Sequence, residues 1–166
     1  MPRVRPSERL CLEPLRVDDA DEMVAVLSDA ALYRFTGGSP PEVEELRRRY
    51  RVQVAGRSPD GRQAWHNWVV RLRADGTAIG FAQATVETAS GTTELAWVIG
   101  SPWQGTGYGR EAIGSLVAAL REAGSSRLIA HVHPEHTASQ RVAEHAGLRR
   151  TGRLVDGEEE WEWRPP

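Results

Sequence analysis

The sequence predicts an α/β protein of the α+β kind, in which a mixed, mostly antiparallel central sheet of about seven strands is flanked by about four helices. Three observations lead to this prediction. Stretches of period-two hydrophobicity and stretches of helical periodicity follow the order β-α-α-β-β-β-α-β-α-β-β. The three consecutive strands are separated only by glycine-containing turns, which is typical of an antiparallel meander. The later strands alternate with helices, which makes the sheet mixed and places helices on both faces.

Length and composition fit one domain over residues 1–166. The chain has 166 residues, 40% of them hydrophobic and 27% charged, with a net charge of −2 at pH 7. A chain of this size buries a sizeable core, and its charge gives no reason to expect nucleic acid or a membrane surface as a partner. The N-terminus has no apolar stretch of signal-peptide length and no run is long enough to span a membrane, so we expect a cytoplasmic protein.

Two features of the composition exclude whole classes of chemistry. Cys11 is the only cysteine, which excludes an intrachain disulfide and a zinc site built from cysteines. All 21 basic residues are arginine. The chain therefore has no Walker A lysine, no lysine Schiff base and no lysine general base.

The first strand and the first helix are predicted near the N-terminus. Residues 8–15 alternate around Leu10 and Leu12, which indicates a strand. A helix follows, and Asp18 or Asp19 is placed to cap it. The apolar face of this helix is formed by Ala20, Met23, Val24 and Leu27.

A second helix is expected to begin at "SPPE", residues 39–42. Ser39 is a capping residue, and Glu42 stands at the capping-box position. The residues expected to face the core are Val43, Leu46, Tyr50 and Val54. The preceding loop, residues 34–38, is expected to carry specificity, and residues 56–62 are expected to be the most mobile stretch.

The rest of the chain is predicted to hold six strands and two helices. The strands of the meander and of the C-terminal part are expected at residues 65–73, 77–88, 92–100, 127–133, 149–154 and 158–163. The helices are expected at residues 107–123 and 137–146, and Gly124 is placed to stop the first of them. The acidic run "DGEEEWEW" is interpreted as the solvent face of an edge hairpin.

The stretch "SPWQGTGYGREA", residues 101–112, follows a predicted strand and opens a predicted helix. A strand, a glycine-rich turn and a helix start in that order form an anion site, because unpaired N–H groups and the positive end of the helix dipole point at one place. The spacing is neither GxGxxG nor the GK[ST] of a Walker loop. The pattern therefore predicts a phosphate-bearing ligand of another kind.

The same stretch resembles the pyrophosphate loop of the GNAT superfamily of acyl-CoA-dependent N-acetyltransferases. Gln104, Gly107 and Gly109 match the pattern Q/R-x-x-G-x-G/A between that family's fourth strand and third helix. "ELAWVIGSPWQGTGYGREA" and the downstream "HPEHTASQRVAEHAGL" look like the RimJ/RimL-type branch, and the resemblance covers most of the chain, including the order of elements. It implies an acetyl-CoA-dependent N-acetyltransferase that needs no metal.

The resemblance also implies a set of residues that bind the co-substrate acetyl-CoA. Main-chain amides of the loop are expected to hold the pyrophosphate, Trp97 to Ile99 to lie beside the pantetheine arm, and Ser139 to lie near the thioester sulfur. The implied binding residues are Trp97, Val98, Ile99, Gln104, Gly105, Thr106, Gly107, Tyr108, Gly109, Arg110, His136 and Ser139.

Direct acyl transfer to an amine requires a group that removes a proton from the amine. Glu94, on the predicted fourth strand, is the first candidate, since similar family members carry a glutamate there. His131 shares a strand face with His133 and is the second candidate, and Glu158 is the third. Each also has a structural interpretation, as a solvated glutamate or a hydrogen-bonded histidine.

Two positions depart from the family pattern. The asparagine that precedes Ser139 in relatives is His136 here, and the tyrosine that many relatives use as the acid for the thiolate is Ala143. The resemblance implies that Ser139 can donate a hydrogen bond to the departing thiolate, as its counterpart is thought to do in the RimJ/RimL-like branch. These departures leave open an acyl-CoA-binding protein without acetyltransferase activity.

A metal enzyme is a further alternative, prompted by "HVHPEH". His131, His133 and His136 could converge on one ion, although no carboxylate is clearly placed as a fourth ligand. A pure interaction module is the remaining alternative, and tight CoA binding would count against it.

The acceptor is expected to be a primary amine, on a protein or peptide N-terminus or on a small molecule. The loops near residues 34–41 and 56–64 and the last hairpin are expected to select it. The strands that carry Trp65, Trp68, Trp161 and Trp163 are expected to lie near one another, which suggests either packing or an aromatic-walled acceptor pocket. A homodimer through the sheet edge or the outer helices is compatible with the sequence.

Overall fold

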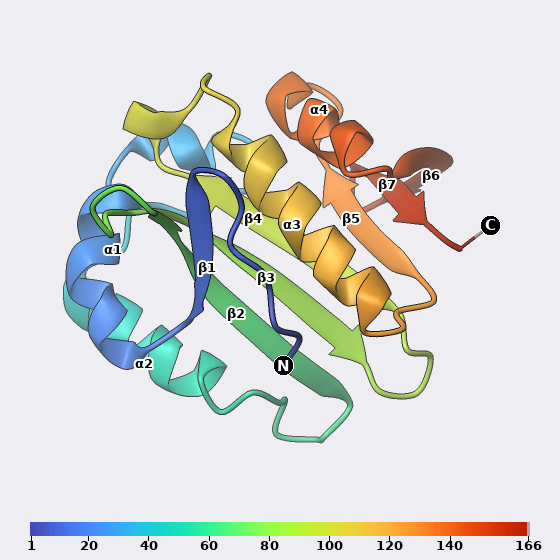
Figure 1. Cartoon of the computed structure of the whole chain (residues 1–166), viewed down its shortest axis with the longest axis horizontal. Coiled ribbons are helices and arrows are strands. Elements are labelled where there is room, and N and C mark those ends of the chain that lie inside the picture. The colour runs from blue at the N-terminus through green and yellow to red at the C-terminus, as the bar shows by residue number, and fades with distance from the viewer. Residues whose placement is uncertain (166) are drawn as a thin grey trace.

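Seven strands, counted over residues 1–165, which the computed structural model describes, form one sheet in the order β1-β2-β3-β4-β5-β7-β6 (Figure 1). The strands are β1 (Leu10–Pro14), β2 (Gln63–Leu72), β3 (Ala78–Glu87), β4 (Thr93–Ile99), β5 (Leu128–Val132), β6 (Arg149–Val155) and β7 (Glu158–Trp163). Every pair of neighbours is antiparallel except β4 and β5, which are parallel. The predicted fold class is confirmed.

Four α-helices within residues 1–165 cover the two faces of the sheet. They are α1 (Ala20–Val26), α2 (Val43–Gln53), α3 (Tyr108–Glu122) and α4 (Thr137–His145). Three short 3₁₀ turns, η1 (Val17–Asp19), η2 (Ala30–Tyr33) and η3 (Ser101–Trp103), lie between elements. None of the helices in the described part of the chain has the length and apolarity needed to cross a lipid bilayer.

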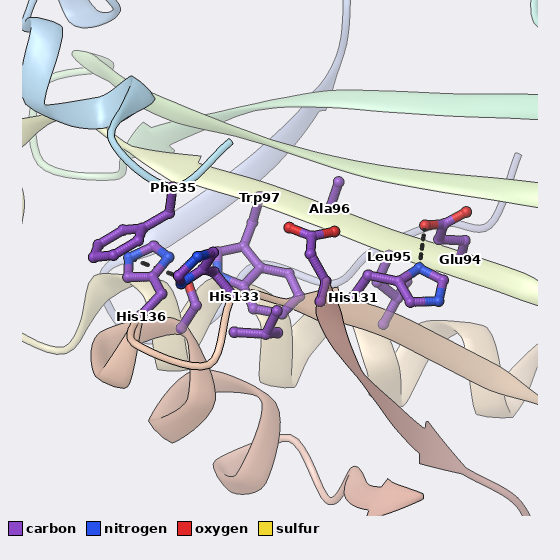
Figure 2. A pocket seen from close by; sticks show the side chains of 11 residues that line it. Phe35, Glu94, Leu95, Ala96, Trp97, His131, His133 and His136 are labelled. Atoms are coloured by element: carbon purple, nitrogen blue, oxygen red, sulfur yellow. Dashed lines mark hydrogen bonds and ion pairs between the residues drawn. The ribbon is translucent and has the colours of Figure 1, made fainter. Parts of the chain in front are cut away.

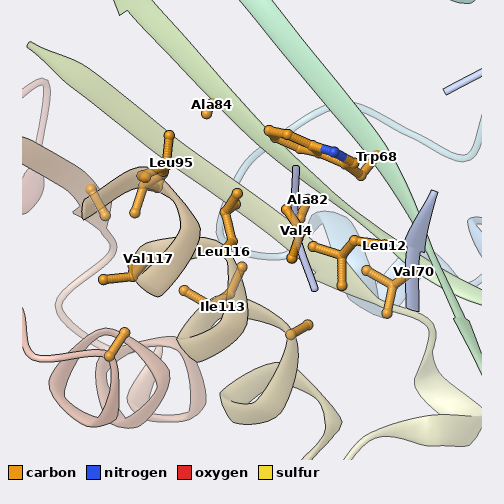
Figure 3. Close-up of a cluster of buried hydrophobic side chains, with 14 of the residues drawn as sticks. Val4, Leu12, Trp68, Val70, Ala82, Ala84, Leu95, Ile113, Leu116 and Val117 are labelled. Atoms are coloured by element: carbon orange, nitrogen blue, oxygen red, sulfur yellow. The ribbon is translucent and has the colours of Figure 1, made fainter. Parts of the chain in front are cut away.

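The larger core lies between α3 and the sheet. Ile113, Leu116 and Val117 are buried on the predicted stripe of α3 and belong to the same cluster as Leu95 of β4 and Trp68 of β2 (Figure 3). A second core on the opposite face joins α1 and α2 to the sheet. Because side chains of a strand alternate between faces, β4 contributes to both cores.

The start of α2 differs from the prediction. The helix begins at Val43 with Glu42 as its N-cap, and no side chain caps it. Ser39 and Pro40 each precede a proline, which disfavours helical backbone at both positions, so the helix starts only after Pro41. At the other end Val54 follows the last turn and is 45% exposed, so it does not face the core as expected.

Asp19 also has a different role from the predicted one. Its side chain makes no cap bond to α1. Instead its Oδ2 accepts a hydrogen bond from the Arg16 N–H at 2.7 Å, and its Oδ1 lies 2.8 Å from Nη2 of Arg71 on β2. Asp19 therefore ties the entry of α1 to the sheet.

The order of the last strands overturns two further expectations. The hairpin of β6 and β7 lies at the edge of the sheet as predicted, but β7 lies between β5 and β6, so the acidic run is not on the edge strand. Glu160 accordingly is only 4% exposed. Three strands separate β2 from β7, so the tryptophans Trp65 and Trp68 on one and Trp161 and Trp163 on the other cannot wall one pocket.

Candidate active site

The site begins where β4 and β5 separate. The two strands pair only at Thr93 with Leu128 and at Glu94 with Ile129, whereas β4 stays paired with β3 as far as Ile99. Among the described residues, the edge of β4 that faces β5 therefore has no strand partner beyond Glu94. Unpaired main-chain groups along this edge are available to a ligand.

A pocket of about 180 Å³ occupies the gap between these strands (Figure 2). Its walls come from β4, β5, the beginning of α4, β7 and the loop after η2. The residues that line it are Phe35, Glu94, Leu95, Ala96, Trp97, His131, Val132, His133, His136, Ser139 and Glu158. The three predicted catalytic residues, Glu94, His131 and Ser139, thus lie in one pocket.

The side chains of Glu94 and His131 form a hydrogen bond across the gap. Oε1 of Glu94 lies 2.8 Å from Nδ1 of His131, and the Glu94 side chain is 50% exposed (Figure 2). Because His131 is two residues beyond Ile129, the strand partner of Glu94, both side chains lie on one face of the sheet. The imidazole therefore holds the carboxylate in place while leaving it accessible.

A buried carboxylate lies behind the imidazole, and the sequence analysis did not identify it. Glu160 stands directly opposite His131 in the β5–β7 pair, and its Oε2 is 4.0 Å from Nε2 of His131. Nε2 is buried and makes no hydrogen bond within the described residues. The result is a line of carboxylate, imidazole and carboxylate that crosses three strands.

The beginning of α4 forms the opposite wall of the pocket. Oγ of Ser139 lies 3.5 Å from Nε2 of His136, which is the N-cap residue of the helix. The His136 ring stacks on Phe35, with the ring centroids 4.6 Å apart, and burial together with nearby His133 lowers the pKa of His136 (Figure 2). Phe35 belongs to the loop predicted to carry specificity. Ala143 is fully buried on α4, and its methyl side chain offers no acid to the pocket.

The three histidines do not converge as a metal site requires. Nδ1 of His131 is bonded to Glu94, whereas Nδ1 of His133 accepts the N–H of Glu135 at 3.1 Å. In residues 1–165 no three histidine, cysteine, aspartate or glutamate side chains are grouped closely enough to hold an ion. The geometry gives no support to the metal-enzyme alternative.

The glycine loop lies at the other end of the site, beyond Ile99. Within the described chain, the N–H groups from Gly105 to Arg110 donate to no main-chain carbonyl. Gly105 and Gly107 have positive φ angles of 80° and 89°, and a Cβ at Gly105 would meet no atom within 4 Å. Six free amides, open space and the N-terminus of α3 suit a phosphate group.

Two residues of the loop anchor its conformation. Nε2 of Gln104 donates to the Ile99 carbonyl at 2.8 Å, and the Gln104 N–H bonds to Ser101 at 3.3 Å, so this amide is engaged, unlike those that follow. A Cβ on Gly109 would lie 3.2 Å from Cγ2 of Val142, so glycine there lets α3 and α4 approach closely.

Comparison with known proteins identifies the family of this fold. Residues 9–149 match the model of the acetyltransferase (GNAT) domain. A comparison with curated proteins finds no match. The predicted family is thereby confirmed from a match that covers most of the chain.

Three solved structures illustrate the likeness of fold. An acetyltransferase of the GNAT family from Bacillus anthracis is 22% identical, with 94% of this chain and 93% of that chain covered and a TM-score of 0.77. AAC(6')-Ib in complex with ribostamycin and coenzyme A is 19% identical, with 95% and 94% covered and a TM-score of 0.77. RimL, a ribosomal L7/L12 alpha-N-protein acetyltransferase in complex with coenzyme A, is 14% identical, with 97% of each chain covered and a TM-score of 0.78.

Proposed function

This chain belongs to the GNAT acetyltransferase family, and we propose that it is an N-acetyltransferase that moves an acetyl group from acetyl-CoA to a primary amine by direct attack in a ternary complex. One observation carries the proposal. Glu94, His131 and Ser139 line one pocket at the end of the unpaired β4 edge, and that edge leads to the free amides of the glycine loop. A long thioester carrier fits such a path, with its phosphates at the loop and its sulfur at Ser139.

The proton of the acceptor goes to Glu94 in the proposed mechanism. An ammonium group has no lone pair, so the carboxylate first takes a proton from it, directly or through a water molecule. His131 keeps the carboxylate oriented through the Nδ1 contact of 2.8 Å and is a relay for the proton. Half of the Glu94 side chain is exposed, so an amine or a water molecule reaches it.

The bond changes then follow at the thioester. The neutral amine nitrogen attacks the carbonyl carbon, the C–N bond forms and the C–S bond breaks, and CoA leaves as a thiolate. The nitrogen then gives up its second proton to the thiolate, directly or through a water molecule, so the products are the amide and the CoA thiol. The Ser139 hydroxyl donates a hydrogen bond to the thiolate sulfur, since Ala143 has no acidic group to offer.

The acceptor is proposed to approach from the α1–α2 side of the sheet. Glu94 pairs with Thr85 on β3, and the Thr85 hydroxyl accepts a hydrogen bond from Nε2 of Gln83 at 3.2 Å. Gln83 also lines a second cavity of about 170 Å³, which includes Tyr50 of α2 and Asn67 of β2. A polar strip thus leads from Glu94 to that cavity, which supports an amine carried by a larger polar body, either a peptide N-terminus or a small molecule.

The test is a thiol-release assay with acetyl-CoA over a library of amines and peptides. Wild type, Glu94→Gln and Ser139→Ala are compared, and Glu144→Gln, an exposed position of α4 outside the pocket, is the matched control. We expect Glu94→Gln to lower turnover by about two orders of magnitude while CoA affinity stays near that of wild type. Equal turnover of Glu94→Gln and wild type would rule Glu94 out as the base.

The replacement of the family tyrosine by Ala143 favours the alternative of a CoA-binding protein without activity. The thiol-release assay together with a calorimetric measurement of CoA binding decides between the two. Calorimetric binding of CoA without thiol release from any amine in the library supports that alternative. Acetylated product, detected by mass spectrometry, rejects it.

A further inference from the structure

Two arginine side chains from distant parts of the chain converge on Gly107. A Cβ placed on Gly107 would lie 3.5 Å from Nη2 of Arg9 and 3.7 Å from Nη2 of Arg110. Arg9 lies just before β1, and Arg110 lies in the first turn of α3. The motif that predicted the loop did not include Arg9.

Arg9 is held firmly, but part of its guanidinium is unused. Its Nε donates to Oε2 of Glu111 at 2.7 Å and its Nη1 donates to the Thr106 carbonyl at 3.1 Å. The guanidinium also lies over the Tyr108 ring, 4.5 Å from the centroid. Nη2 makes no hydrogen bond within residues 1–165, so the free edge faces Gly107 already oriented.

Glu111 keeps this arrangement in its ionised form. Its Oε1 accepts hydrogen bonds from the Ser7 hydroxyl at 2.7 Å and from the Arg9 N–H at 2.8 Å. Burial works against the charge, but these hydrogen bonds and the one from the Arg9 side chain prevail and lower the pKa of Glu111. The carboxylate therefore stays bound to Arg9 at neutral pH.

The local charge is out of balance. Two guanidinium groups and the N-terminus of a 15-residue helix meet at Gly107. The carboxylate of Glu111 forms an ion pair with Arg9, Glu8 acts on Arg9 more weakly and without an ion pair, and Arg110 has no ion-pair partner in residues 1–165. Like charges this close repel one another, although the chain as a whole carries a net charge of −2. An anion between the two guanidinium groups removes the repulsion, and guanidinium groups match phosphate oxygens in geometry.

We propose that Arg9 and Arg110 bind a phosphate group of CoA at Gly107, so that the N-terminal segment supplies a ligand-binding side chain to the glycine loop. The inference rests on the proposed function, because the ligand is the acetyl carrier of that reaction. The diphosphate and the 3′-phosphate of CoA share the required chemistry. Binding of dephospho-CoA, which lacks only the 3′-phosphate, distinguishes them.

The experiment measures CoA and dephospho-CoA binding by calorimetry for wild type, Arg9→Gln and the control Arg5→Gln. Arg5 is an exposed arginine that pairs with Glu122 at the far end of α3, so its substitution makes the same change in charge away from the loop. We expect Arg9→Gln to weaken CoA binding roughly 10- to 100-fold at low salt and less at high salt, because screening weakens the charge contribution. Arg5→Gln is expected to bind CoA like wild type.

The two ligands assign the phosphate. If Arg9→Gln loses affinity equally for CoA and dephospho-CoA, the contact is with the diphosphate. If the loss disappears with dephospho-CoA, the contact is with the 3′-phosphate. Either result supports the proposal.

Two further variants separate charge from loop structure. Arg9→Lys keeps the charge but replaces the three nitrogens of the guanidinium with one, which cannot bind Glu111 and Thr106 and still present a separate free edge to the ligand. It is therefore expected to retain part of the affinity. Equal losses in Arg9→Lys and Arg9→Gln, without salt dependence, would mean that Arg9 only shapes the loop and would overturn the proposal. Unchanged affinity of Arg9→Gln would also overturn it.

Arg110→Gln keeps the test decisive if Arg9→Gln does not fold. Its side chain makes no ion pair in the described chain, and circular dichroism verifies the fold. It is expected to weaken CoA binding in the same salt-dependent way, and unchanged affinity rejects the proposed contact of the two arginines with phosphate. Failure of wild type to bind CoA would reject the proposed function itself, whereas wild-type binding and turnover with unaffected arginine variants would reject this inference alone.

Discussion

The two ends of the site are built on different principles. The loop end, which comprises residues 105–110 with Arg9 and Glu111, presents main-chain N–H groups and guanidinium groups. The pocket end, which comprises Glu94, His131 and Ser139 with their neighbours, presents carboxylates, imidazoles and a hydroxyl. The binding proposed at the loop uses bare main-chain N–H groups together with two guanidinium groups, whereas the reaction proposed in the pocket uses a carboxylate, an imidazole and a hydroxyl. Substitutions at the two ends are therefore expected to separate affinity from turnover.

The largest effect is expected from Gly107→Val. The Cβ of the new side chain would lie 3.5 Å from Nη2 of Arg9 and 3.7 Å from Nη2 of Arg110, at a φ of 89° that β-branched residues avoid. We expect CoA affinity to fall by about two orders of magnitude or more in calorimetry. Gly114→Ala, on the same helix with open space around its Cβ, is the control and is expected to bind CoA normally. Near-normal affinity in a folded Gly107→Val variant would contradict the role of the loop.

Ser139→Ala is the matching change in the pocket. It removes the hydrogen bond expected at the departing sulfur, so we expect turnover to fall roughly tenfold without a change in CoA affinity. Ser125→Ala, beyond the end of α3, serves as the control. A loss of CoA affinity as large as the loss of turnover would show that Ser139 belongs to binding rather than to the reaction.

Glu111→Gln tests the stability of the loop end. Glu111 accepts three hydrogen bonds from Ser7 and Arg9, so we expect a loss of about 1–2 kcal/mol in the free energy of unfolding at pH 7. Since the folded-state pKa is lowered, this stabilisation is present above the ordinary value of 4.5 and is lost as the pH falls through the folded-state value. Urea unfolding at pH 7 and pH 3 measures it, and a difference that persists undiminished at pH 3 would contradict it.

The exposed Glu122 of the same helix is the control for Glu111. Its partner Arg5 is also exposed, so Glu122→Gln is expected to change the free energy of unfolding by less than about 1 kcal/mol. Equal effects of the two substitutions would show that the buried hydrogen bonds of Glu111 add nothing.

The smallest effect concerns protonation at the pocket end. Burial, and then the proximity of His133, lower the pKa of His136, so the folded state favours the neutral ring stacked on Phe35. This contribution to stability is complete above the ordinary value of 6.5 and declines as the pH falls below it. We expect a midpoint below 6.5 for His136 in an NMR titration and a smaller decline of the melting temperature on acidification in His136→Asn than in wild type.

His145→Asn, at the exposed end of α4, is the control for the melting-temperature measurement. It is expected to leave the decline of the melting temperature as in wild type. A His136 midpoint at or above 6.5 would mean that the pocket end does not disfavour the charged ring. The stabilisation from neutral His136 starts to decline below 6.5, and that from ionised Glu111 starts to decline below 4.5. On acidification, the pocket end is therefore expected to lose stability before the loop end.

Local patterns determined most of the elements, and with them the strand or helix on which each candidate residue lies. Hydrophobic period placed the strands and helices within a few residues of their observed bounds, and glycines in the sequence identified the turns and the loop. Glu94, His131 and Ser139 were each assigned to the correct element. These predictions succeed because periodicity, turn chemistry and the glycine spacing are properties of a few neighbouring residues.

What brings these residues together is decided only by the tertiary structure. The position of β7 beside β5 buries Glu160 behind His131, and the three strands between β2 and β7 separate the two tryptophan pairs that were expected to lie near one another. The divergence of β4 from β5 opens the pocket, Phe35 reaches it from a distant loop, and Arg9 reaches Gly107 across most of the chain. Which strands become neighbours depends on burying both faces of the whole sheet at once, and no short stretch of sequence carries that information.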